Sequence, residues 1–193
     1  MKAVNVYNMT REQLYQALDV DAENFTAPCK DTCKIFSTMP NELYYLDPCE
    51  RIYHDKVIPT AYNLVNNTGS KAAVHVYAYC NSCQHKGRVM ATQKREASMA
   101  DIIKGTGLSK RSVINALNVL SDIGYMRAYK DAQDSRIQHY RINPVYWDIS
   151  KAREIDWIDW ILFADVLTSY LDEETVKKLN NMAYTQWIRN YSR

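Results

Sequence analysis

SMADIIKGTGLSKRSVINALNVLSDIGY, residues 98–125, is the stretch that decides the fold. Ser98 is a favourable helix N-cap, and Asp101 follows in the first turn, where the helix dipole stabilises an acidic side chain. Gly105 and Gly107 interrupt this short helix, and Ser109 can cap the next one. The stretch therefore predicts two helices joined by a tight turn.

The second of these helices is predicted from Lys110 to about Ile123, with Gly124 as its C-terminal stop. Apolar residues recur at spacings of four, three and three and form one face: Val113, Leu117, Leu120 and Ile123. The opposite face is polar and carries Lys110, Arg111, Ser112, Asn115 and Asn118. One face is therefore expected in a core and the other in solvent.

The flanking residues extend the pattern in both directions. Ser70 can cap a helix from Lys71 to about Gln84, and residues 89–92 form a short apolar strand candidate. After Gly124, two predicted strands at 125–130 and 137–142 enclose a polar turn. The expected order is helix, strand, helix, turn, helix and β-hairpin.

This order resembles the winged helix-turn-helix superfamily. The matching positions are Ile102 and Ile103 in the short helix, Gly107-Leu108-Ser109 in the turn, Val113 and Leu117 in the next helix, and Leu120 with Gly124-Tyr125 at the exit. The resemblance covers about 75 of the 193 residues. It implies a mostly α fold with a small β-hairpin wing, in which the helix after the turn reads double-stranded DNA.

The distribution of charge agrees with this expectation. Residues 86–143 hold 11 Lys/Arg and 5 Asp/Glu, a net charge of +6, whereas the segments before and after them each carry −2. A concentrated basic block attracts a polyanion. The alternative is a solvated basic face, or a winged helix that serves as a protein-interaction adaptor.

The candidate DNA-binding residues come from the polar helix face and from the hairpin. A helix fits the major groove and presents its N-terminal side chains to bases and phosphates, while a basic wing contacts the backbone or the minor groove. The predicted set is Ser109, Lys110, Arg111, Ser112, Asn115 and Asn118 from the helix, with Arg127, Lys130, Arg136, His139 and Arg141 from the hairpin.

The chain divides into three predicted parts: an N-terminal α/β region at 1–70, the DNA-binding domain at 71–147 and a C-terminal helical hairpin at 148–193. Thr10 and Gln13 have the spacing of a capping box for a helix from Arg11 to about Asp19, and residues 43–46 suit a strand. Apolar residues crowd the region from Ile155 to Tyr170, and a second helix is predicted at 173–191. These C-terminal helices either form a homodimer or pack onto the N-terminal region.

Other functional classes find less support. Cys29, Cys33, Cys80 and Cys83 form two close pairs that allow zinc or redox chemistry, but Cys80 and Cys83 fall within the predicted helix, and inert thiols are the preferred interpretation. Neither a metal nor a cofactor is predicted. No Walker loop, G-x-S-x-G or H-E-x-x-H motif indicates an enzyme. No run of eighteen apolar residues suggests a membrane span, so a cytoplasmic protein is expected.

Two biological roles match the predicted DNA-binding surface. The first is transcription regulation, with the C-terminal helices setting the spacing of half-sites in a dimer. The second is plasmid or phage replication initiation, because residues 89–92 and 140–144 are similar to the RepL-type plasmid replication proteins of Firmicutes. The tyrosine-rich N-terminal region and the tryptophan-rich C-terminal helices depart from that family.

Overall fold

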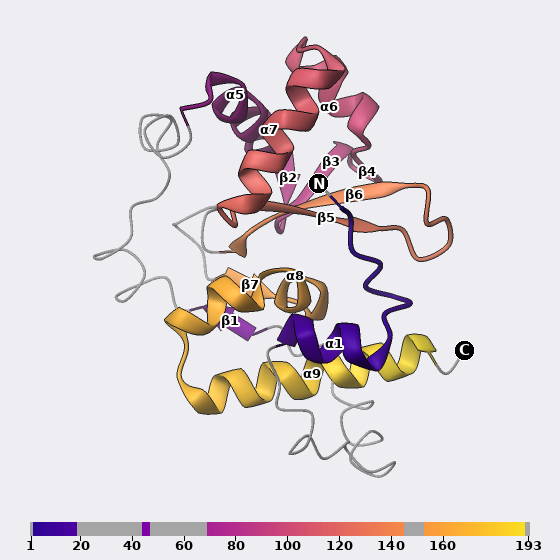
Figure 1. Cartoon of the computed structure of the whole chain (residues 1–193), viewed down its shortest axis with the longest axis vertical. Helices are drawn as coiled ribbons and strands as arrows, with labels where there is room; N and C mark the ends of the chain where they lie inside the picture. The colour runs from indigo at the N-terminus through magenta and orange to yellow at the C-terminus, as the bar shows by residue number, and fades with distance from the viewer. Residues whose placement is uncertain (1, 19–43, 47–68, 145–152, 192–193) are drawn as a thin grey trace.

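Three helices form the upper layer of the molecule in a computed structural model that describes residues 2–18, 44–46, 69–144 and 153–191 (Figure 1). They are α5 (Lys71–Ser82), α6 (Met99–Thr106) and α7 (Lys110–Asp122). Each begins where the sequence predicts: the side chain of Ser70 accepts from the Ala73 amide, Ser98 forms a capping box with Asp101, and Ser109 caps α7. Only the end of α5 differs, because Gln84 leaves the helix to pair with Val89.

The middle layer is a small antiparallel sheet. Its strands are β2 (Gln84–His85), β3 (Arg88–Thr92), β4 (Arg95–Glu96), β5 (Met126–Lys130) and β6 (Gln138–Ile142), in the order β2-β3-β6-β5 with β4 beside β3. The hairpin β5–β6 is in register from Met126↔Ile142 to Lys130↔Gln138, as the sequence predicts. The N-terminal segment covers the free edge of β5, because the Val4 amide donates to the carbonyl of Ala128 and its carbonyl accepts from the amide of Lys130.

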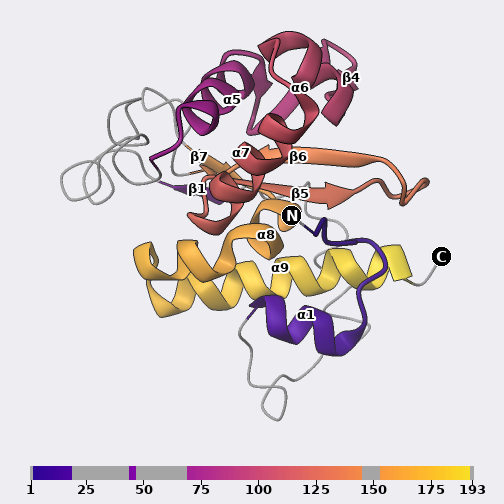
Figure 2. The same ribbon diagram turned by 45° about the horizontal axis from the view of Figure 1, so that its top comes forward.

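The lower layer is built from elements near both ends of the chain (Figure 2). It contains α1 (Arg11–Leu18), α8 (Trp157–Leu167), the 3-10 turn η2 (Thr168–Tyr170) and α9 (Glu173–Tyr191), with the short strands β1 (Tyr44–Leu46) and β7 (Arg153–Ile155) paired antiparallel. The predicted capping box of α1 is confirmed by reciprocal bonds between Thr10 and Gln13. Ile155 belongs to β7 rather than to the predicted helix, and α8 starts after the N-cap Asp156.

Separate hydrophobic cores lie on the two faces of the sheet. The upper core contains Val113, Leu117 and Leu120 of α7 together with the hairpin residues Met126 and Tyr140. The lower core gathers α1, α8 and α9, so residues 6–18 pack against the C-terminal helices, which is the second of the two arrangements expected for those helices. The apolar side chains of α8 are buried within the chain, so among the described residues the C-terminal helices offer no large exposed apolar face to a second copy.

Gly124 connects the upper and lower layers. Its φ of +74° is a left-handed conformation that ends α7 and turns the chain into β5. A β-carbon at this position would lie 2.8 Å from Cγ2 of Val166 in α8. The predicted stop after α7 is therefore also a point of close contact with the C-terminal layer. Within the described ranges, no helix is both long and apolar enough to cross a membrane.

Candidate nucleic-acid interface

The turn between α6 and α7 is held by its own hydrogen bonds. The Gly107 amide donates to the carbonyl of Ile103 at 2.9 Å, and the Thr106 hydroxyl donates to the carbonyl of Ile102 at 2.7 Å. Ser109 then accepts from the Ser112 amide at 3.1 Å and caps α7. These local bonds fix the direction in which the first turn of α7 leaves the domain.

The start of α7 presents a basic, unneutralised surface. Ser109, Lys110, Arg111 and Asn115 are exposed, and Ser112 is half-buried. Among the residues that the structure describes, no carboxylate pairs with Lys110 or Arg111. Figure 1 shows that this end of the upper layer points away from α8 and α9. The side-chain charges add to the positive end of the helix dipole, which favours a bound anion.

Asn118 lies two turns further along α7 and is half-buried. Its Oδ1 atom is buried and has no hydrogen-bond partner in the described part of the chain. Its amide is therefore less accessible than that of Asn115, although both were predicted on the same polar face.

Two of the predicted wing residues remain near the surface. Arg136 lies in the turn of the β5–β6 hairpin with 89% of its side chain exposed, where it forms a 2.8 Å ion pair with Asp134. Lys130 is half-buried at the end of β5. In the ranges described, no carboxylate lies within ion-pair distance of Lys130.

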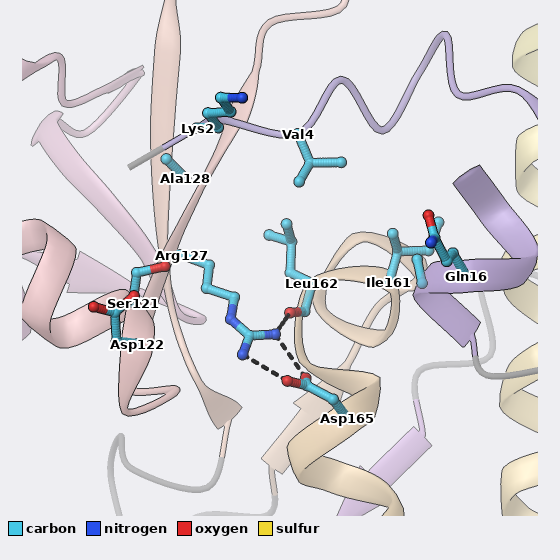
Figure 3. Close-up of a pocket in the computed structure, with 11 residues that line it drawn as sticks. Lys2, Val4, Gln16, Ser121, Asp122, Arg127, Ala128, Ile161, Leu162 and Asp165 are labelled. Atoms are coloured by element: carbon cyan, nitrogen blue, oxygen red, sulfur yellow. Dashed lines mark hydrogen bonds and ion pairs between the residues drawn. The ribbon is translucent and has the colours of Figure 1, made fainter.

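Arg127 is directed toward the lower layer instead (Figure 3). Its guanidinium forms a bidentate ion pair with Asp165 of α8, with N–O distances of 2.6 and 2.7 Å, and also donates to the carbonyl of Leu162. The pair lies on the wall of a cavity of about 480 Å³, where α1, α7, β5, α8 and the N-terminal segment meet. Arg127 thus joins the hairpin to α8, and we leave it out of the interface.

Arg141 is enclosed more completely. Only 1% of its side chain is exposed, and it donates to Asp156 at 2.9 Å and to Asp159 at 3.1 Å. Its guanidinium also lies 5.6 Å from the ring centre of Tyr129. A buried, doubly paired arginine cannot reach a phosphate, so the assignment of Arg141 to the DNA surface is corrected.

Burial and charge act against each other in this cluster. Burial raises the pKa of Asp159 well above its ordinary value, although the adjacent Arg141 opposes the shift. Burial alone would lower the pKa of Arg141, but Asp159 and Asp156 outweigh that effect and hold it above the usual range. Arg141 therefore stays charged and anchors β6 to the N-terminus of α8.

His139 also has partners inside the protein. Its Nε2 lies 2.9 Å from Oδ2 of Asp131, and its Nδ1 lies 3.6 Å from Oε2 of Glu96. The hydrogen bond to His139 is the main cause that lowers the pKa of Asp131. The Tyr129 hydroxyl donates to the same Glu96 at 2.7 Å. His139 therefore belongs to a polar cluster under the hairpin.

The alternation of side chains along a strand explains these corrections. Met126 and Ala128 point into the upper core, so Arg127 and Tyr129 between them point to the opposite face of the sheet. That face was expected to be open to solvent, but the lower layer covers it. The sequence does contain a signal for this contact. Asp156, Asp159 and Asp165 are the acidic residues at the start of α8 and within it, and they provide partners for the two arginines of the hairpin.

The two described cysteines of the zinc hypothesis, Cys80 and Cys83, differ in burial. Cys80 is fully buried among core residues, where burial raises the pKa of its thiol. Cys83 follows the last residue of α5 and is half-buried. In the described ranges, no group of three or more His, Cys, Asp or Glu side chains is arranged to hold a metal ion. Cys29 and Cys33 lie outside those ranges.

Comparison with known proteins adds no relative to this description. No family model, curated protein or solved structure matches the chain.

Proposed function

We propose that this protein binds double-stranded DNA in a sequence-specific manner and regulates transcription, with residues 71–144 acting as a winged helix-turn-helix domain. The observation that carries the proposal is the pair Lys110 and Arg111, exposed at the capped start of α7 and free of carboxylate partners among the described residues. A helix presented in this way fits the major groove, where its first residues reach phosphates and base edges.

The arrangement around α7 supports the same proposal. The elements α5, β3, α6, α7 and the β5–β6 hairpin follow one another in the order expected of a winged helix, and β3 pairs with β6 at Arg88↔Arg141. Lys130 and Arg136 are the basic residues of the predicted wing that remain near the surface. The proposed interface therefore consists of Ser109, Lys110, Arg111, Ser112 and Asn115, with Asn118 at its edge and Lys130 and Arg136 at its flank.

This smaller interface makes a quantitative prediction. Four cations, Lys110, Arg111, Lys130 and Arg136, neutralise at most four phosphates, and each phosphate contributes about −0.9 to the slope of log K against log salt concentration. We expect a slope of about −3 to −4. The full basic block of residues 86–143, with its net charge of +6, would give about −5.

The test has two steps. Random duplexes are first enriched for binding to the full chain, and the enriched duplex is then titrated by fluorescence anisotropy at several salt concentrations. Enrichment of a defined motif together with a slope of −3 to −4 supports the proposal. A flat salt dependence, or no enrichment, contradicts it and leaves a protein-interaction adaptor.

Mapping of bound sites in the genome distinguishes the roles open to a DNA-binding protein. Occupancy at promoters supports a regulator, whereas occupancy confined to repeats at one replication origin supports an initiator. Among the described residues, the C-terminal helices expose no large apolar surface that would support the predicted homodimer. A palindromic motif in the enriched duplexes would be the evidence for it.

A further inference from the structure

A tight hairpin formed by β2 and β3 follows α5. Gln84↔Val89 and His85↔Arg88 are the paired residues, and Lys86 and Gly87, with φ of 49° and 78°, make the two-residue turn. The pairing continues past β2, because the amide of Met90 donates to the carbonyl of Cys83 at 3.2 Å. Cys83 therefore lies opposite Met90.

His85 and Met90 share one face of this hairpin. His85 lies opposite Arg88, and Met90 is two residues after Arg88 on the same strand, so the alternation of paired strands directs both to one side. Val89 points to the other side and is fully buried in the upper core. Cys83 is the C-cap of α5, where its thiol donates to the carbonyl of Cys80 at 3.5 Å, and it lines the same open hollow of about 470 Å³ as His85 and Met90, together with Ala91, Thr92 and Gln93.

We infer that Cys83, His85 and Met90 bind a soft monovalent metal ion, Cu(I). Thiolate and thioether sulfurs select Cu(I), and imidazole is a good third ligand for copper. Zinc in structural sites takes four ligands from Cys, His, Asp or Glu, a set that the described residues do not provide. The zinc site suggested by the spacing of the cysteines would use thiolates alone, whereas this site includes the thioether of Met90.

Cu(I) binds the Cys83 thiolate, so a copper–sulfur bond replaces the sulfur–hydrogen bond and one proton is released to solvent.

Cys80 serves as an internal comparison. It lies one helical turn before Cys83 but faces the core, where it is fully buried. The hollow gives an ion access to Cys83, whereas an ion would have to displace core side chains to reach Cys80. Metal binding at this hairpin should consequently depend on Cys83 and not on Cys80.

The test uses the full chain with Cys29→Ser, Cys33→Ser and Cys49→Ser, so that Cys80 and Cys83 are the remaining thiols. Cu(I) is titrated without oxygen in competition with bicinchoninate. We expect one equivalent of bound Cu(I), loss of binding in Cys83→Ser, and at least a tenfold weaker affinity in Met90→Leu, which conserves side-chain volume. Met99→Leu, a partly buried methionine of α6, is the matched control and should bind like the parent.

X-ray absorption of the complex should show two sulfur ligands and one nitrogen ligand. The inference is overturned by an absence of bound Cu(I) in the parent, by equal affinities of the Met90→Leu and Met99→Leu variants, or by binding that survives Cys83→Ser. Zinc that competes equally with Cu(I) would also overturn it. The same Met90→Leu and Met99→Leu pair in the chain with all five cysteines gives a second comparison if the serine background unfolds.

Discussion

Replacing Arg141 by methionine removes the guanidinium that pairs with Asp156, the N-cap of α8, and with Asp159 in its first turn. Asp159 would be left with 2% of its side chain exposed and without its 3.1 Å guanidinium partner. Breaking one side of a buried ion pair destabilises a protein by about 3–5 kcal/mol. Because burial already raises the pKa of Asp159, the carboxyl can take up a proton, which limits the loss to about 3 kcal/mol.

Urea unfolding followed by circular dichroism measures this loss directly. For a chain of this size, a decrease of 3 kcal/mol corresponds to a fall in Tm of about 6–12 °C. The matched control is Asp165→Asn, which removes an ion pair from the same helix. The Asp165 side chain is 59% exposed, so the pair with Arg127 contributes about 0.2–1 kcal/mol.

Two further measurements separate a lost ion pair from a general packing defect. Without Arg141, the folded-state pKa of Asp159 lies even further above its unfolded value, so the contribution of Asp159 to stability is greatest at low pH and is lost as pH rises through that folded pKa. The Arg141→Met variant should therefore be closer to wild type at pH 5 than at pH 8. Adding Asp159→Leu should restore stability to within about 1 kcal/mol of wild type. A loss below 1 kcal/mol for Arg141→Met, or an equal loss for Asp165→Asn, would refute the reasoning.

Two other substitutions test the frame that positions α7. Gly124→Ala should lower the free energy of unfolding by at least about 1–2 kcal/mol, because φ is +74° and the new β-carbon meets Val166 at 2.8 Å; urea unfolding that matches wild type would contradict this. Asp101→Ala should cost about 1 kcal/mol at pH 7, since Asp101 caps α6 and pairs with Arg95 at 2.8 Å. The hydrogen bond from Arg95 lowers the pKa of Asp101, so this contribution is present above about pH 4 and is lost as pH falls further; a difference between variant and wild type that is constant from pH 7 to pH 2 would disagree.

The parts of the fold that the sequence predicts depend on residues close together in the chain. Ser70, Ser98 and Ser109 each cap a helix by bonding an amide three residues later. The turn residues 131–136 lie between two strands that pair without a shift in register. Such short-range signals determine where the helices and the hairpin form, because in other conformations the backbone amides at these positions would have no hydrogen-bond partner.

The direction of the hairpin side chains depends on residues far away in the sequence. Arg127 pairs with Asp165, 38 positions later, and Arg141 pairs with Asp159, 18 positions later. Strand alternation places both arginines on one face, but it does not say whether solvent or another layer covers that face. In α7, Val113, Leu117 and Leu120 are buried as predicted, and Lys110, Arg111 and Asn115 are exposed, because helical periodicity alone distinguishes these two faces.

The central claim is that the first turn of α7 contacts DNA, and the most direct test compares Arg111→Ala with Lys177→Ala. Each variant loses one exposed cation, but Lys177 lies on α9 in the opposite layer. On the enriched duplex, we expect Arg111→Ala to weaken binding by about 1–3 kcal/mol and Lys177→Ala to bind like wild type. Wild-type affinity for Arg111→Ala, or an equal loss in both variants, would contradict the claim.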